Sequence, residues 1–193
     1  MTGANNAYLN AKTNFMKLPL PGLLLLACCF TACRPDGSAN SQAEGKPRIA
    51  LRPFTDTLKQ DTFKVFLRGD RPKNMELVFS ITPAQGTPVY QKNLRASELI
   101  DNYKETVELG KEKEQLKFIN EELNLFFDEE NFLEPAVTEN EEADKNTPDK
   151  KFFAELKKSG LNGFKYRLGK DKKIYIAWSV SEKKVLPYYE CCQ

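Results

Sequence analysis

Two short runs of alternating apolar residues constrain the fold of this chain most strongly. Apolar residues occupy every second position from Met75 to Ile81, and again from Ile174 to Val180. Successive side chains of a β-strand point to opposite faces, so each run predicts a strand with one buried face. The protein therefore needs a buried sheet face on each side of the long segment that separates the two runs.

Neighbouring segments extend each run into a predicted meander. Residues 63–67 and 89–94 are the expected partners of the first run, and residues 164–168 and 185–191 are those of the second. Pro187 marks the last segment as an edge strand or a broken one, because proline cannot donate a hydrogen bond to a ladder. The sequence thus predicts two three-stranded antiparallel meanders.

The middle of the chain has helical spacing instead. Apolar residues share one helix face from Leu99 to Val107 and from Leu116 to Phe127, and Ser97 is the expected N-cap of the first segment. A third helix is predicted with Thr147 as N-cap and Gly160 at its end. This order of strands, helices and strands predicts an α+β fold, with two or three helices packed on one face of antiparallel sheet.

A short apolar run follows Lys17 near the N-terminus. It covers 13 residues, from Leu18 to Phe30, whereas a membrane-spanning helix needs roughly 20. Its length is typical of the hydrophobic region of a secretory signal. The small residues Thr31 and Ala32 then precede Cys33 directly.

This arrangement resembles a bacterial lipoprotein signal peptide of the kind cleaved by signal peptidase II. In that family the cysteine that ends the box receives diacylglycerol and is then acylated at its amino terminus. The resemblance implies a signal peptide over residues 1–32, of which 1–15 are an over-called start or a long polar segment. Cys33 is the implied lipidation site, and Cys28 is the alternative.

The resemblance also implies where the protein works. A lipid at the N-terminus would fasten it to a membrane of the bacterial envelope, with the outer membrane favoured because Arg34 is not an acidic retention residue. Residues 33–48 are then expected to be the lipidated cysteine and a flexible tether. Residues 49–193 are expected to form one domain.

Composition excludes several classes of function. The net charge of +2 is too small to predict nucleic-acid binding, which needs a large excess of basic residues. The chain has no histidine, which excludes histidine-based triads and histidine metal sites. It also lacks nucleophile-elbow, phosphate-loop and dinucleotide-binding glycine patterns. We therefore expect no catalytic residue, no metal site and no cofactor.

Three clusters remain as candidate sites. Cys191 and Cys192 are expected to be a structural pair, such as a disulfide, in the oxidising envelope. Residues 128–150, with nine acidic residues and two lysines, are expected to be a solvated acidic loop. A basic strand surface with aromatic residues is a candidate binding face for a glycan or an acidic protein, or else part of the core. It comprises Lys172, Lys173, Tyr175, Trp178, Tyr188 and Tyr189.

These observations favour binding over catalysis. We expect a non-enzymatic binding or scaffold lipoprotein on the periplasmic side of the envelope, with a protein partner in an envelope-associated assembly such as a secretion apparatus. One alternative is a periplasmic inhibitor or immunity-type lipoprotein. Another is a hydrolase that uses carboxylates or a Ser-Lys pair, which would need a pocket holding two perturbed carboxylates.

Overall fold

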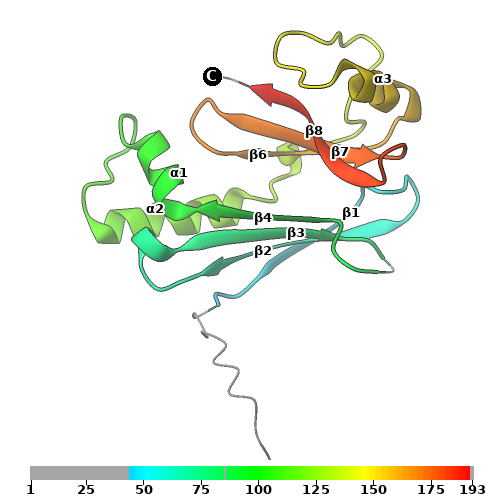
Figure 1. Cartoon of the computed structure of the whole chain (residues 1–193). Coiled ribbons are helices and arrows are strands. Elements are labelled where there is room, and N and C mark those ends of the chain that lie inside the picture. Colours follow the sequence, from blue (N-terminus) through cyan, green and yellow to red (C-terminus); the bar gives the residue numbers. More distant parts are fainter. Residues whose placement is uncertain (1–43, 85, 192–193) are drawn as a thin grey trace, which may run out of the picture. The chain divides into compact units, whose positions relative to one another are not determined.

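The computed structural model describes residues 44–84 and 86–191, which contain two four-stranded antiparallel sheets (Figure 1). The first sheet has the order β1 (Arg48–Pro53), β2 (Gln60–Arg68), β3 (Glu76–Thr82) and β4 (Tyr90–Arg95). The second has the order β5 (Phe132–Leu133), β6 (Gly163–Arg167), β7 (Lys173–Ser179) and β8 (Lys184–Cys191). The α+β fold class is confirmed, with one more strand in each sheet than predicted.

The signal peptide, the lipidation sites and most of the tether lie outside the described residues, and so does Cys192. The last residues of the expected tether are described, and they are already part of the first sheet. Glu44 bridges to Arg68, and the backbone N–H of Gly45 donates to the carbonyl of Leu67 at 2.7 Å. The first sheet therefore includes residues several positions before Ile49.

The first sheet contains a strand that the sequence pattern did not predict. In β1, Ala50 faces Phe63 of β2 and contributes to the core, whereas Ile49 and Leu51 point to the other face and are 59% and 51% exposed. The large apolar residues of β1 thus lie on the solvent side. A strand of this kind lacks the usual buried alternation and is hard to recognise.

The second sheet follows its predicted pattern more closely. Phe164 of β6 lies opposite Ile176 of β7, and both side chains are buried. Pro187 lies on the edge strand β8, at a bulge where the pairing register shifts, which confirms the expectation for this proline. The extra strand β5 has only two residues and so carries no periodicity.

The two sheets face each other across an aromatic core. Phe63 and Phe79 from the first sheet each have ring centroids 5.3 Å from that of Phe164 in the second. Helices α1 (Ala96–Tyr103) and α2 (Glu112–Leu125) bury residues such as Leu99 and Ile119 in the same cluster. Aromatic side chains bury large areas, and this cluster joins the sheets into one folded body.

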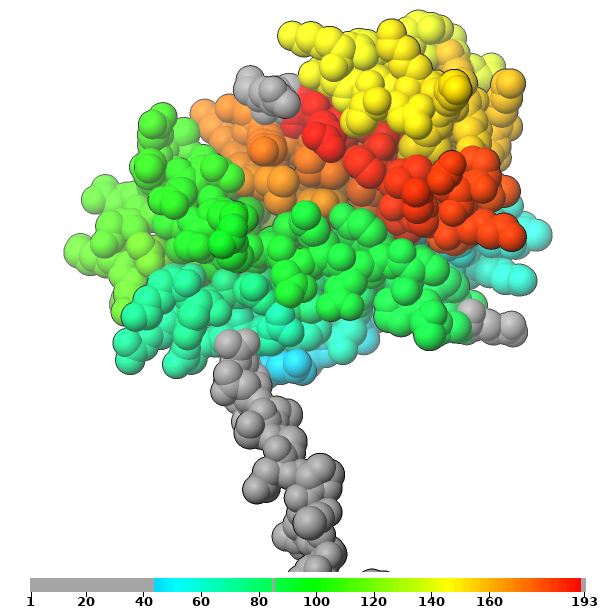
Figure 2. All heavy atoms as spheres, viewed as in Figure 1, coloured from blue at the N-terminus to red at the C-terminus, as the bar shows by residue number. Residues whose placement is uncertain are grey.

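Helix α3 (Lys150–Ser159) packs on the face of the second sheet that points away from the aromatic core. Its Phe152, Phe153 and Leu156 form a smaller cluster with Ala177 of β7 and Tyr188 of β8. Figure 2 shows residues 130–160, in yellow and gold, lying over the orange and red strands of this sheet. The helices are therefore divided between two apolar clusters.

Two predicted N-caps are wrong. Asp149 caps α3, because its carboxylate accepts from the amides of Lys151 and Phe152, whereas the Thr147 hydroxyl accepts from Asp144 in the preceding turn. Arg95 takes the place of Ser97 at the start of α1. The Gly160 prediction is confirmed, since this residue ends α3 in the left-handed conformation with φ of 62°.

Candidate functional site

The acidic segment and the edge of the second sheet enclose a groove of about 530 Å³. Its walls come from residues 132–144, from α3 and from strands β7 and β8. Grooves of several hundred cubic ångströms are large enough to hold one or two side chains of a partner. The residues that line it are Phe132, Leu133, Glu134, Pro135, Ala136, Thr138, Glu141, Glu142, Asp144, Phe153, Tyr175, Tyr188 and Tyr189.

Three tyrosines form the floor of this groove. The ring centroid of Tyr175 lies 5.3 Å from that of Tyr189 and 6.0 Å from that of Tyr188. Tyr188 is the extra residue of the β8 bulge, since Tyr175 pairs with Tyr189 and Ile176 pairs with Pro187. A bulge re-aims side chains, and here it lets two consecutive tyrosines contact the same neighbour.

Tyr188 attaches the acidic segment to the sheet. Its side chain is 3% exposed, and its hydroxyl donates to the carbonyl of Ala136 at 2.9 Å. The Tyr188 hydroxyl also lies close to Gly163 of β6. A Cβ atom at Gly163 would lie 2.9 Å from the Tyr188 hydroxyl and 3.0 Å from the Ala136 Cβ, so glycine is required for this close approach.

The rim of the groove carries four acidic residues and no basic one. Glu141 accepts from the amide of Thr138 at 2.5 Å, and Asp144 accepts from the hydroxyl of Tyr189 at 3.2 Å. These two carboxylates stabilise the local turns. Glu134 is exposed and makes no hydrogen bond or ion pair within the described ranges.

The fourth rim carboxylate has a basic neighbour outside the groove. Glu142 pairs with Lys157 of α3 at 3.1 Å, and the same ammonium group donates to the carbonyl of Glu141 at 2.7 Å. The Glu142 side chain is largely exposed, so this pair is worth little energetically. It nevertheless holds the acidic segment close to α3.

Two tyrosines of the floor, Tyr175 and Tyr188, stay neutral over a wide pH range. Burial, and then the neighbouring Tyr189 and Glu141, raise the pKa of Tyr175. Burial and the same glutamate also raise the pKa of Tyr188. A floor of aromatic rings below a rim of carboxylates is suited to a cation, which is attracted by both.

The predicted basic and aromatic face is divided by the fold. Tyr175, Tyr188 and Tyr189 come together, but next to the acidic segment. Trp178 shares the opposite face of β7 with Ile174 and Ile176 and packs between the two apolar clusters. Tyr175 and Trp178 lie three residues apart on β7, so they point to opposite faces of the sheet. This alternation could have shown from the sequence that the two side chains do not share one face.

The two lysines of the predicted face lie elsewhere. Lys172 lines a separate groove of about 380 Å³ with residues of β4 and α1, among them Arg95 and Glu98. Lys173 is the first residue of β7 and pairs with Cys191. The tyrosines of the floor are therefore grouped with carboxylates, and Lys172 and Lys173 do not line their groove.

No protein-family model, curated protein or solved structure matches this chain. The site therefore has to be interpreted from its own geometry. Among the described residues, none of the helices combines the length and the apolar composition of a membrane span. The same part of the chain holds no cluster of three or more acidic or cysteine side chains placed to bind a metal. Cys191 is disulfide-bonded, and its partner lies outside the described ranges.

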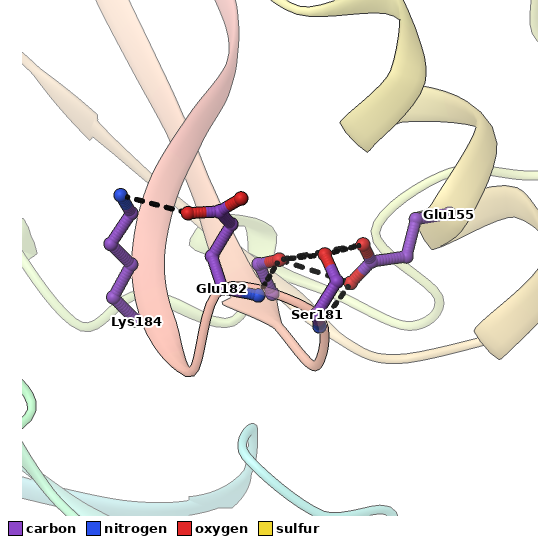
Figure 3. Close-up of polar contacts among 5 residues, drawn as sticks. Glu155, Ser181, Glu182 and Lys184 are labelled. Carbon is purple, nitrogen blue, oxygen red and sulfur yellow. Dashed lines mark hydrogen bonds and ion pairs between the residues drawn. The ribbon is translucent and has the colours of Figure 1, made fainter.

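A second polar cluster joins α3 to the turn between β7 and β8 (Figure 3). The Glu155 carboxylate accepts from the Ser181 hydroxyl at 2.5 Å, from the Ser179 hydroxyl at 3.1 Å and from the backbone N–H of Val180 at 2.7 Å. Burial alone would raise the pKa of Glu155, but these hydrogen bonds together lower it. The cluster thus holds the β7–β8 hairpin against α3.

This serine and carboxylate cluster lacks the features of a nucleophilic site. A carboxylate with a lowered pKa is a weaker base than an ordinary glutamate, so the hydrogen bonds to Glu155 do not favour its activating a serine hydroxyl. Ser179 is fully buried and also accepts from the amide of Glu182. Lys184 pairs with Glu182 at 3.2 Å rather than with a serine.

A third cluster contains the one described carboxylate whose pKa is raised. Burial raises the pKa of Glu122, although Arg167 at 3.4 Å opposes this. The adjoining cavity holds only about 10 Å³, which is room for a single water molecule. Glu122 lines this small cavity and Glu155 does not, and neither of them lines the tyrosine groove.

Proposed function

We propose that the protein is a lipid-anchored binding protein of the bacterial envelope, and that its groove holds a basic segment of a partner protein. The proposed anchor is Cys33, from the resemblance to lipoprotein signals. The partner would belong to an envelope-associated assembly such as a secretion apparatus. The tyrosine floor with its purely acidic rim is the single observation that supports a basic ligand.

The groove offers two kinds of contact to a lysine or arginine side chain. The aliphatic part of the side chain would lie on the rings of Tyr175 and Tyr189, and its charge would approach Glu134. A cation over an exposed aromatic ring gains about 0.5–1 kcal/mol, and an exposed ion pair gains about as much. Several such contacts would give binding in the micromolar to millimolar range, which suits a reversible scaffold.

The position of the groove also suits an anchored protein. The described chain starts at the first sheet, whereas α3 and the acidic segment, which line the groove, lie beyond the second sheet (Figure 1). A partner could therefore reach the groove from the side of the domain that is remote from the anchor.

The test is a titration of the protein with a tetralysine peptide, followed by NMR or calorimetry. We expect saturable binding, and Glu134→Gln should weaken it about three- to tenfold, because each exposed ion pair contributes about 1 kcal/mol at most. Glu139→Gln is the matched control, since Glu139 is an exposed acid of the same segment that does not line the groove. Equal weakening by both substitutions, or equal binding of tetraglutamate, would contradict the proposal.

The inhibitor or immunity-type alternative would use the same groove. It differs only in its partner, which would then be a periplasmic toxin or hydrolase. A neighbouring gene that encodes such an effector would favour this alternative over a scaffold.

A further inference from the structure

The hairpin formed by β1, β2 and their connecting loop exposes a concentration of apolar side chains. Six large apolar side chains are exposed among the described residues, and three of them are Ile49, Leu51 and Leu58 of this hairpin. Leu58 in the loop is 89% exposed. Their exposure shows that no described element covers this part of the molecule.

Ile49 and Leu51 share the outer face of the first sheet. Ala50 lies opposite the buried Phe63, so its two neighbours must project away from the core. The described helices bury their apolar residues elsewhere, α1 and α2 in the larger cluster and α3 on the second sheet. Within residues 44–84 and 86–191, nothing therefore covers the outer face of the first sheet where these two residues lie.

Lysines accompany these apolar residues. Lys64 lies across the ladder from Ile49, and its ammonium group is 5.0 Å from the ring centroid of Phe66. Lys46 precedes β1, and Lys59 follows Leu58 in the loop. Lys46 and Lys64 form no ion pair with another described residue. Exposed aliphatic side chains next to unpaired lysines are typical of surfaces that lie among anionic lipid headgroups.

The position of the hairpin in the chain also favours a contact with the membrane. Ten residues separate Cys33 from Glu44, the first described residue. A chain of this length spans about 40 Å at most, even when fully extended. A lipid at Cys33 would therefore keep β1 close to the bilayer surface, which favours a weak surface contact through its high effective concentration.

We propose that the outer surface of this first hairpin lies against a bilayer that carries anionic lipids. Ile49, Leu51 and Leu58 enter the interfacial region, and the neighbouring lysines contact the headgroups. This inference rests on the proposed anchoring, which brings the hairpin to the membrane. Figure 2 shows the acidic segment, in yellow, on the far side of the second sheet from the first sheet. The groove that this segment lines would therefore lie away from the bilayer.

A tryptophan probe tests the contact in the full chain. Leu51→Trp and Val180→Trp are compared with the parent chain on vesicles of phosphatidylcholine and phosphatidylglycerol that contain a brominated lipid. The parent gives the background from Trp178. We expect the emission of the Leu51→Trp chain to shift to the blue and to be quenched. The Val180→Trp chain should show no quenching beyond the parent, because Val180 is equally exposed but lies in the hairpin of the second sheet.

The lysine contribution is tested in the same assay. Adding Lys59→Glu and Lys64→Glu to the Leu51→Trp chain should abolish the excess quenching. The inference would be overturned if the Leu51→Trp chain were quenched no more than the parent chain. It would also be overturned if two copies cross-linked through β1 while the tryptophan at position 51 stayed unquenched. Failure of the anchoring is seen separately, because the parent chain would then not float with the vesicles. Failure of the groove proposal is also separate, since the tetralysine titration needs no membrane.

Discussion

Gly163 offers the sharpest test of how the groove is built. A Cβ at this position would meet the Tyr188 hydroxyl at 2.9 Å and the Ala136 Cβ at 3.0 Å. Neither neighbour can move easily, because Tyr188 is buried and its hydroxyl is bonded to the Ala136 carbonyl. Gly163→Ala should therefore push the acidic segment away from the second sheet.

The expected loss of stability follows from three contributions. Overpacking of a buried site costs about 1–3 kcal/mol, and loss of a buried hydrogen bond costs about 1 kcal/mol. Replacing glycine by alanine restricts the unfolded chain and returns about 0.5–1 kcal/mol. The net destabilisation is about 2 kcal/mol, which lowers the Tm of a domain of this size by about 4–8 °C.

Urea unfolding and thermal melting measure this effect directly. Gly110→Ala is the matched control, because a Cβ at Gly110 meets nothing within 4 Å and its backbone has no positive φ. In a chain that carries Tyr188→Phe, Gly163→Ala should be less damaging than in the parent, since the closest clashing atom is absent. Equal effects of Gly163→Ala and Gly110→Ala would refute the close approach of tyrosine, glycine and acidic segment.

Three further results are expected. Glu155→Gln should destabilise the protein by about 1 kcal/mol at pH 7, because a carboxylate that accepts several hydrogen bonds is lost. The pKa of Glu155 is lowered from 4.5, so its stabilisation is present above that value and is lost as the pH falls through the folded pKa. Urea unfolding should therefore show the variant and the parent converging in acid. Glu122→Gln should behave in the opposite way, because burial raises the pKa of Glu122 and ionisation destabilises the fold as the pH rises through 4.5. This variant should match the parent in acid and gain up to about 1 kcal/mol at neutral pH, and a loss at pH 7 would show that the Arg167 pair dominates. Binding of tetralysine should weaken several-fold between 0.05 and about 0.3 M salt, since screening shortens the Debye length to below about 10 Å. Binding that does not depend on salt would contradict recognition by the acidic rim.

Residue patterns were sufficient for the elements whose apolar side chains face the core. The alternation around Phe79 and Ile176 predicted β3 and β7, and the spacing of Leu116, Ile119 and Leu123 predicted α2. β1 was missed because its large side chains point outward. β5 was missed because two residues show no period, and such a strand exists only through its pairing with β6.

The site was harder to predict than the fold. The sequence singled out Tyr175, Tyr188 and Tyr189, but lysines such as Lys173 and Lys184 lie within a few positions of them, and a basic surface was the natural interpretation. The acidic segment reaches them only through tertiary contacts, such as the bond from Tyr188 to Ala136, about fifty positions apart. Long-range contacts of this kind leave no local pattern, so the sign of the charge around the tyrosines could not be predicted.

The proposed location in the envelope depends on the chemistry of Cys33. Mass spectrometry of the protein isolated from its own envelope measures that chemistry most directly. We expect a mature chain that begins at Cys33 and carries a diacylglyceryl thioether and an amide-linked acyl chain. A mature chain that retains residues 16–32 with an unmodified Cys33 thiol would contradict the lipid anchor and the envelope role proposed from it.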